Sequence, residues 1–177
     1  MKKTVWHLGL LGFALTTLGG TLLHFLYEWS GNSVWLAPFS GVNESTFEHM
    51  KLLFWPSFLF ALIESLFLKD RKDFFCIKLK GILLGLLLIP VLFYTYNGVI
   101  GKSPDWVNIA IFFISAAAMF IYEAKLFNKE TVICRPDKWA LIFLIVIGIL
   151  FAVFTFNAPE IGIFIDPLTK STGIKQP

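Results

Sequence analysis

Long apolar segments alternate with short polar ones along this chain. Four windows contain no Lys, Arg, Asp or Glu, namely residues 4–27, 81–101, 106–122 and 139–159. A helix needs about 20 largely apolar residues to cross the ~30 Å hydrocarbon core of a bilayer. A fifth segment, 45–68, is equally apolar after Lys51 but carries Glu64. The pattern predicts an all-α, polytopic transmembrane bundle with about five spans.

The boundaries of these segments predict a single membrane domain over residues 1–177. Its five spans are expected at approximately 5–28, 45–68, 77–97, 105–127 and 137–157, followed by an outer tail at 158–177. Ser45 and Glu48 fit a capping box at the start of the second span, and Lys51 is placed to pair with Glu48.

The distribution of basic residues predicts the orientation of the bundle. Eleven of the 15 Lys and Arg residues fall before the first span and in the loops after the second and fourth spans. Basic residues near span ends are retained in the cytoplasm. We therefore expect the N-terminus inside and the C-terminus outside.

The composition agrees with a lipid environment. Charged residues make up 15% of the chain and hydrophobic residues 56%, whereas a soluble domain has about 25% charged residues. The net charge of +3 follows from the topology, so the predicted partner is the lipid bilayer and not nucleic acid. Cys76 and Cys134 fall in loops predicted to be cytoplasmic, where a structural disulfide is not expected.

Polar residues from every span gather near the predicted outer face. His24 and Glu28, like Glu44 and Glu48, are four residues apart, a spacing that places two side chains on one helix face. His49 is next to Glu48. The rest of the polar cluster consists of Tyr27, Asn43, Tyr94, Asn97, Asp105, Asn108 and Asn157. Asp166, in the outer tail, is expected near the same face.

Three interpretations of the cluster remain open. The first is structural, with helix capping and interhelical hydrogen bonds. The second is a divalent transition-metal site, since His and carboxylate ligands suit zinc, iron or manganese; its expected ligands are His24, Glu28, Glu48 and His49, with Glu44 and Glu48 as candidates for a catalytic base. The third is a haem, quinone or small-molecule pocket around His24 and His49.

Two further carboxylates lie close to the predicted cytoplasmic face. Glu64 is in the inner third of the second span, and Glu123 is near the inner end of the fourth. We expect both to reach the interface and to pair with Lys69 and Lys125.

The block Val42-Asn43-Glu44-Ser45-Thr46-Phe47-Glu48-His49-Met50-Lys51-Leu52 resembles the signature segment of an uncharacterised family of small bacterial multi-pass membrane proteins. The stretches at 93–96 and 155–156 are similar to the same family. The resemblance implies a location in the bacterial cytoplasmic membrane and carries no activity.

Two functions from different classes follow. One is a non-catalytic binding, transport or accessory protein, with a small molecule or lipid as its ligand. The other is a metal-dependent, hydrolase-type membrane enzyme that acts on a lipid-borne substrate at the outer face.

Overall fold

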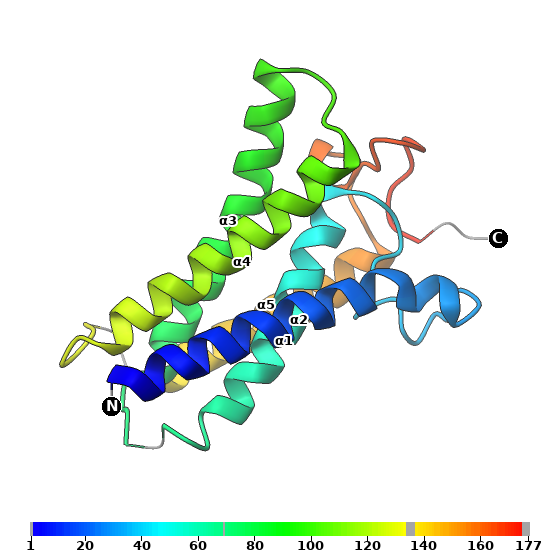
Figure 1. Cartoon of the computed structure of the whole chain (residues 1–177). Coiled ribbons are helices and arrows are strands. Elements are labelled where there is room, and N and C mark those ends of the chain that lie inside the picture. Colours follow the sequence, from blue (N-terminus) through cyan, green and yellow to red (C-terminus); the bar gives the residue numbers. More distant parts are fainter. Residues whose placement is uncertain (1, 69, 134–136, 175–177) are drawn as a thin grey trace.

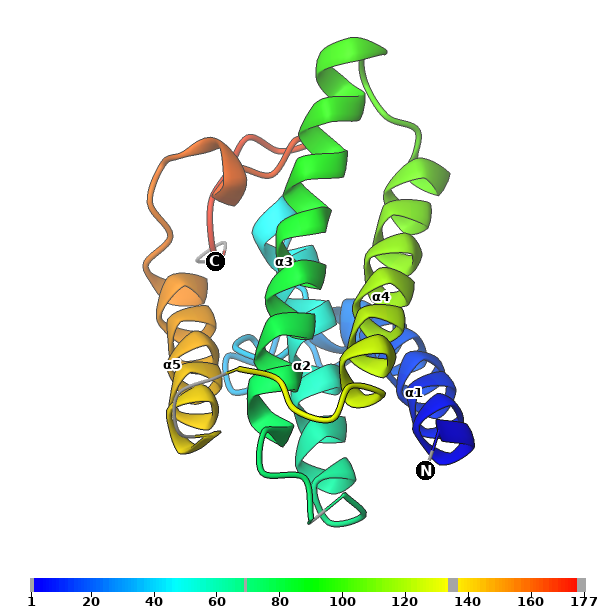
Figure 2. The same ribbon diagram turned by 90° about the vertical axis from the view of Figure 1, so that its left-hand side faces the viewer.

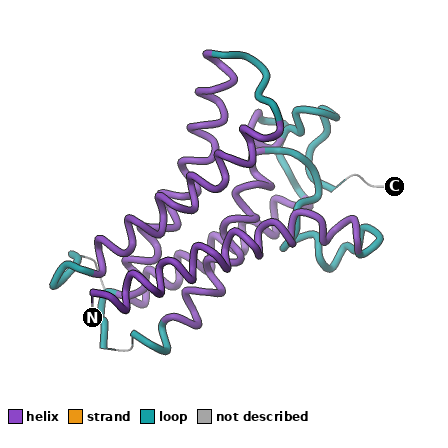
Figure 3. The backbone as a smooth tube through the Cα atoms, viewed as in Figure 1, coloured by secondary structure: helices purple, strands orange, loops and turns teal. Residues whose placement is uncertain are grey.

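The computed structural model describes residues 2–68, 70–133 and 137–174, and its regular structure is helical (Figures 1 and 3). Five α-helices follow one another: α1 (Lys2–Trp29), α2 (Thr46–Glu64), α3 (Phe74–Val99), α4 (Asp105–Phe127) and α5 (Asp137–Phe156). A 3-10 turn, η1 (Gly162–Phe164), lies in the C-terminal tail. The predicted all-α fold is confirmed.

Four of the helices, α1, α3, α4 and α5, are long and apolar enough to cross a membrane. The helix α2 differs because Glu48, Lys51 and Glu64 interrupt its apolar sequence. At 1.5 Å per residue its 19 residues are about 28 Å long, which is close to the thickness of the hydrocarbon core.

The helix α2 occupies the middle of the bundle. It contacts each of the other four helices, while α3 packs against both α4 and α5, and α1 packs against α4. Figure 2 shows α3 and α4 side by side, with α5 beyond α3 and α1 beyond α4. The four apolar helices therefore surround α2, and its polar residues are enclosed by protein.

The outward faces of these helices are apolar. Leu10, Leu87 and Phe143 are each about 60% exposed or more, and many similar side chains share the same helix faces. Lys51, in contrast, has no exposed surface. Charged groups inside and apolar groups outside are the arrangement expected when the solvent is lipid.

Small residues let α1 approach its neighbours closely. A Cβ atom on Gly20 would lie 2.9 Å from the carbonyl oxygen of Leu52 in α2 and 2.6 Å from the ring of Phe112 in α4. Close approach at small residues is a common means of packing helices in membranes. Gly20 thus sets the spacing of three helices near the polar residues described below.

Among the described residues, the carboxylates of Glu64 and Glu123 pair with Lys78 and not with Lys125, one of the two lysines expected from the sequence. Both face Lys78 of α3: Lys78 Nζ is 3.0 Å from Glu64 Oε2, and it is also hydrogen-bonded to Glu123. All three side chains are buried. Lys69 lies outside the described residues. The prediction for Lys125 failed because a buried carboxylate gains more from a cation in the protein than from one at the interface.

The two ends of the bundle differ in chemistry. The start of α1 and the connections after α2 and α4 lie at one end, which we call the basic end; the connection 30–45 and the C-terminal tail lie at the other, the polar end (Figure 1). This arrangement agrees with the alternating spans, and the assignment of the polar end to the outer face stays a prediction.

At the basic end Cys76 is disulfide-bonded, contrary to expectation; Cys134 lies outside the described residues.

Candidate metal centre at the polar end

The first turn of α2 is built by local hydrogen bonds. The Ser45 hydroxyl accepts from the Glu48 amide, which makes Ser45 the N-cap, and the Asn43 side chain accepts from the Ser45 amide at 2.8 Å. The Glu48 side chain accepts from the amide of Val42, at 3.0 Å, and not from Ser45. Only the Ser45 half of the predicted capping box is therefore formed.

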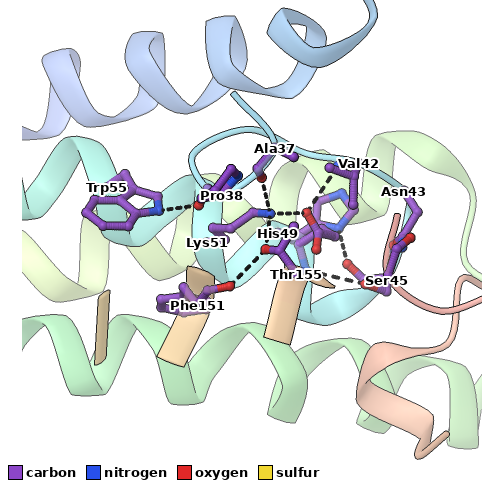
Figure 4. A network of polar contacts seen from close by, with 12 residues as sticks. Ala37, Pro38, Val42, Asn43, Ser45, His49, Lys51, Trp55, Phe151 and Thr155 are labelled. Carbon is purple, nitrogen blue, oxygen red and sulfur yellow. Dashed lines mark hydrogen bonds and ion pairs between the residues drawn. The ribbon is translucent and has the colours of Figure 1, made fainter. Parts of the chain in front are cut away.

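Lys51 ties α2 to the connection 30–45 and to α5 (Figure 4). Its Nζ donates to the Ala37 carbonyl and to Thr155 Oγ1, each at 2.9 Å, and lies 2.6 Å from Glu48 Oε2. Three acceptors satisfy the three hydrogens of the ammonium group. The predicted pair of Lys51 with Glu48 is confirmed.

This network removes Glu48 from the expected ligand set. Glu48 is 1% exposed, and Lys51 and the Val42 amide take up its carboxylate. Its one-residue separation from His49 directs the two side chains to different faces of α2. Glu28 is also separate: it is exposed at the end of α1, and its side chain has no hydrogen bond or ion pair among the described residues.

The structure instead brings together His24, Glu44 and His49. His24 Nε2 lies 3.5 Å from Glu44 Oε1, and His49 Nε2 lies 3.7 Å from Glu44 Oε2. One ligand atom from each residue lies within 4.8 Å of the other two. The three residues are all partly buried, and they come from α1, from the residue before the N-cap of α2 and from α2 itself.

A backbone hydrogen bond orients His49. Its Nδ1 is 2.9 Å from the carbonyl oxygen of Ser45. Because a carbonyl can only accept, Nδ1 carries a hydrogen, and in the neutral imidazole the lone pair is then on Nε2, the atom that faces Glu44. A histidine that donates through one nitrogen to a carbonyl and presents the other is the usual arrangement of a metal ligand.

The distances within the cluster suit metal ligands better than hydrogen bonds. Typical N–H···O bonds are 2.7–3.2 Å long, and both Nε2–carboxylate distances exceed this range. Ligands about 2.1 Å from a tetrahedral ion lie about 3.4 Å apart along the edge of the tetrahedron. Each carboxylate oxygen of Glu44 faces one of the two imidazoles. The haem interpretation of His24 and His49 stays a prediction.

The C-terminal tail lies against the same site. Asp166 Oδ2 accepts from the Glu44 amide at 3.5 Å, and the Asn43 amide group donates to the carbonyl of Gly173 at 3.0 Å. Burial alone would raise the pKa of Asp166. Hydrogen bonds from the amides of Leu168 and Thr169, together with that from Glu44, outweigh burial and lower this pKa below its ordinary value.

A cavity of about 540 Å³ adjoins the three residues. Its polar lining includes His24, Glu44 and His49, with Asp105 and Asn108 from the first turn of α4. The remaining wall is mostly apolar and is formed by Gly20, Thr21, Phe25, Leu52, Ile109, Phe112, Phe113 and Leu168. The volume is within the range of about 300–1,000 Å³ that is usual for small-molecule sites.

Other members of the predicted polar cluster lie outside the group of His24, Glu44 and His49. Asn97 accepts from the Ser103 amide, and the Ser103 hydroxyl donates to Asn108, so these residues close the connection between α3 and α4. Tyr27 is buried, whereas Tyr94 is 45% exposed. Asn157 is exposed, and its side chain donates to the Val153 carbonyl at 3.5 Å.

The place of Glu44 in the centre could not be found from helical spacing. Glu44 precedes the N-cap Ser45, so it is not on α2, and the four-residue separation from Glu48 has no helical meaning there. The signal that would have found it is the Asn-Glu-Ser sequence itself, because a cap at Ser45 turns the residue before it away from the helix.

Comparison with known proteins identifies a family but no activity. No curated protein and no solved structure matches this chain. The model of a family of unknown function, DUF6512, matches residues 2–174. This match covers nearly the whole chain, in agreement with the uncharacterised family expected from the sequence. The chain therefore belongs to the DUF6512 family, whose members have no assigned function.

Proposed function

We propose that this multi-pass membrane protein binds a divalent transition metal ion, zinc above all, through His24, Glu44 and His49. The observation that carries the proposal is the pair of Nε2–carboxylate distances, 3.5 and 3.7 Å, around one glutamate. Two imidazoles and one carboxylate are a common protein ligand set for zinc. The Ser45 carbonyl, which orients His49, supplies the outer-shell contact that such sites need.

Charge favours a cation at this position. Glu44 and the nearby Asp166 are both acidic, and Asp105 lines the adjoining cavity. Lys51, buried close by, is already neutralised by Glu48. A divalent ion would therefore compensate carboxylates that have no Lys or Arg partner among the described residues.

Metal analysis of the purified protein tests the proposal. Full-length protein in detergent is incubated with Zn²⁺, separated from free ion by gel filtration and analysed for metal. We expect about one equivalent of zinc for the wild type and a large loss for His49→Ala and Glu44→Gln, since each removes one of three ligands. The matched controls are His7→Ala and Glu28→Gln, which change exposed residues of the same types away from the centre.

The result that contradicts the proposal is equally clear. Wild-type protein that retains less than about a tenth of an equivalent of any transition metal has no such site. Equal zinc content in Glu44→Gln and Glu28→Gln would show that the ion binds elsewhere.

One observation favours a second candidate function, metal-dependent hydrolysis. A zinc ion with three protein ligands keeps a fourth position for water or a substrate oxygen, as in catalytic sites. The cavity adjoins the three residues and contains one further carboxylate, that of Asp105, which is the group available to accept a proton from water. Glu48, a base expected from the sequence, is held by Lys51 and does not suit this role.

Hydrolysis of a long-chain ester in detergent micelles separates binding from catalysis. An enzyme loses turnover in Asp105→Asn while it retains zinc, because Asp105 is not a ligand. A binding protein shows no zinc-dependent hydrolysis in either form, and the non-catalytic interpretation then holds.

A further inference from the structure

The cavity beside the metal centre opens between two membrane-spanning helices. Its walls come from α1, through Thr21 and Phe25, and from α4, through Ile109 and Phe113. These four side chains are also exposed on the bundle surface. Figure 1 shows that α1 and α4 diverge toward the polar end, and the residues that line the cavity belong to this part of both helices. In a bilayer, a ligand that enters by this opening comes from the lipid.

The depth of the centre matches the headgroup level of a lipid. His24 is five residues before the end of α1, a rise of about 7–8 Å. His49 is in the first turn of α2, and Asp105 and Asn108 are in the first turn of α4. The polar end of the cavity therefore lies where ester and phosphate groups meet the hydrocarbon, and its apolar part extends toward the chains.

We propose that the cavity between α1 and α4 binds one acyl chain of a membrane lipid and that an ester or phosphate oxygen of this lipid occupies the open position of the metal. The inference rests on the proposed metal site. The apolar side chains Phe25, Ile109 and Phe113 contact the chain, and the polar residues Asp105 and Asn108 border the head. Leu168, from the tail, covers the cavity at the polar end.

Photo-crosslinking in detergent micelles tests this inference. Full-length, zinc-loaded protein is titrated with phosphatidylcholine that carries a diazirine on its acyl chain. Labelled peptides are identified by mass spectrometry after illumination. We expect saturable labelling of the segments that contain Phe25 and Phe113, displaced by excess unlabelled lipid.

Two variants of the same helix provide the matched comparison. Ile109→Trp fills the cavity, whereas Ile114→Trp makes the same change on an exposed part of α4 that does not line the cavity. We expect Ile109→Trp to lower the saturable labelling roughly tenfold, the effect of about 1.4 kcal/mol of lost contacts, and Ile114→Trp to leave it unchanged. Neither variant changes a ligand, so both retain zinc.

The outcomes separate the lipid site from the metal site. Non-saturable labelling spread over all lipid-facing helices, or equal labelling of the two variants, overturns the lipid site even if zinc is retained. Wild-type protein without zinc overturns the proposed function and the coordination of the lipid together. Labelling that does not depend on zinc overturns the coordination alone.

A second probe identifies the coordinating oxygen. A diacylglycerol that carries the same diazirine chain lacks phosphate but keeps the ester carbonyl. Zinc-dependent labelling by both lipids assigns the ester carbonyl, and labelling by phosphatidylcholine alone assigns the phosphate; either result supports the inference.

Discussion

At the scale of single residues, Lys51 shows why charged groups are tolerated inside this apolar chain. Its ammonium group has three acceptors from three parts of the molecule, and its side chain has no exposed surface. A buried charge is costly when its partner is removed, because the remaining charge is left without compensation. The pair of Lys51 and Glu48 therefore holds the connection 30–45 in place, and with it Glu44 of the proposed metal site.

The variant Lys51→Met tests this role. Since it leaves Glu48 buried and unpaired, we expect a loss of about 3–5 kcal/mol in stability, measured as a lower midpoint of thermal unfolding in detergent. The double variant Lys51→Met/Glu48→Gln removes both charges and should recover part of the loss. A single variant as stable as the wild type would contradict the structural role of the pair.

Asp166 gives the contact between the C-terminal tail and Glu44 a defined pH dependence. Because its pKa is lowered in the folded protein, the stabilisation is complete above the ordinary value of 3.8 and is lost as pH falls through the lower, folded pKa. We expect hydrogen exchange of the Leu168 amide to accelerate, relative to its intrinsic rate, only in this acidic range. In Asp166→Asn the protection should be weak at every pH, and a transition near neutral pH would assign the effect to another group.

At the scale of elements, the basic ends of α2, α3 and α4 are joined by one buried lysine between two carboxylates. Lys78 contacts both Glu64 and Glu123 and lies 5.1 Å from the centre of the Phe120 ring. A Cβ on Gly81 of α3 would collide with the Glu123 side chain of α4. The absence of a side chain at Gly81 therefore leaves room for Glu123 beside α3. The group is a structural joint between three helices.

Removal of this lysine should separate the helices. We expect Lys78→Met to destabilise the protein by about 3–5 kcal/mol or to prevent its insertion, because it leaves two buried carboxylates close together. Lys80→Met, a change of the same kind at a more exposed position two residues away, should have little effect on the thermal midpoint. Similar midpoints of thermal unfolding for the two variants would contradict the role of Lys78 in holding the three helices together.

Helix positions were largely predictable from the sequence, whereas the contacts between helices were not. Windows free of charge mark α1, α3, α4 and α5 because lipid excludes unpaired charge, and Ser45 marks the start of α2. The pairing of Glu64 and Glu123 with Lys78 depends on how three helices cross, which no local pattern encodes. Of the candidate metal ligands, His24 and His49 lie together in the structure with Glu44, whereas Glu28 and Glu48 do not join them. The direction of the residue before the N-cap depends on contacts with the tail, which the sequence does not reveal.

At the scale of the whole molecule, the separation of a basic end from a polar end predicts one orientation in the membrane. Basic residues near the spans favour the cytoplasm, so the metal centre and the C-terminal tail are expected outside. A fusion of alkaline phosphatase after residue 177 should be active in bacterial cells, and the same enzyme fused after residue 130 should be inactive. Activity of the second fusion but not the first would reverse the orientation and place the centre in the cytoplasm.

The identity of the ligands is the central claim, and X-ray absorption at the zinc edge of the loaded protein tests it most directly. We expect only nitrogen and oxygen neighbours at about 2.0–2.1 Å, with the outer-shell scattering of two imidazoles, reduced to one imidazole in His24→Ala. A spectrum without imidazole scattering, or one with sulfur neighbours, would contradict a centre formed by His24, Glu44 and His49.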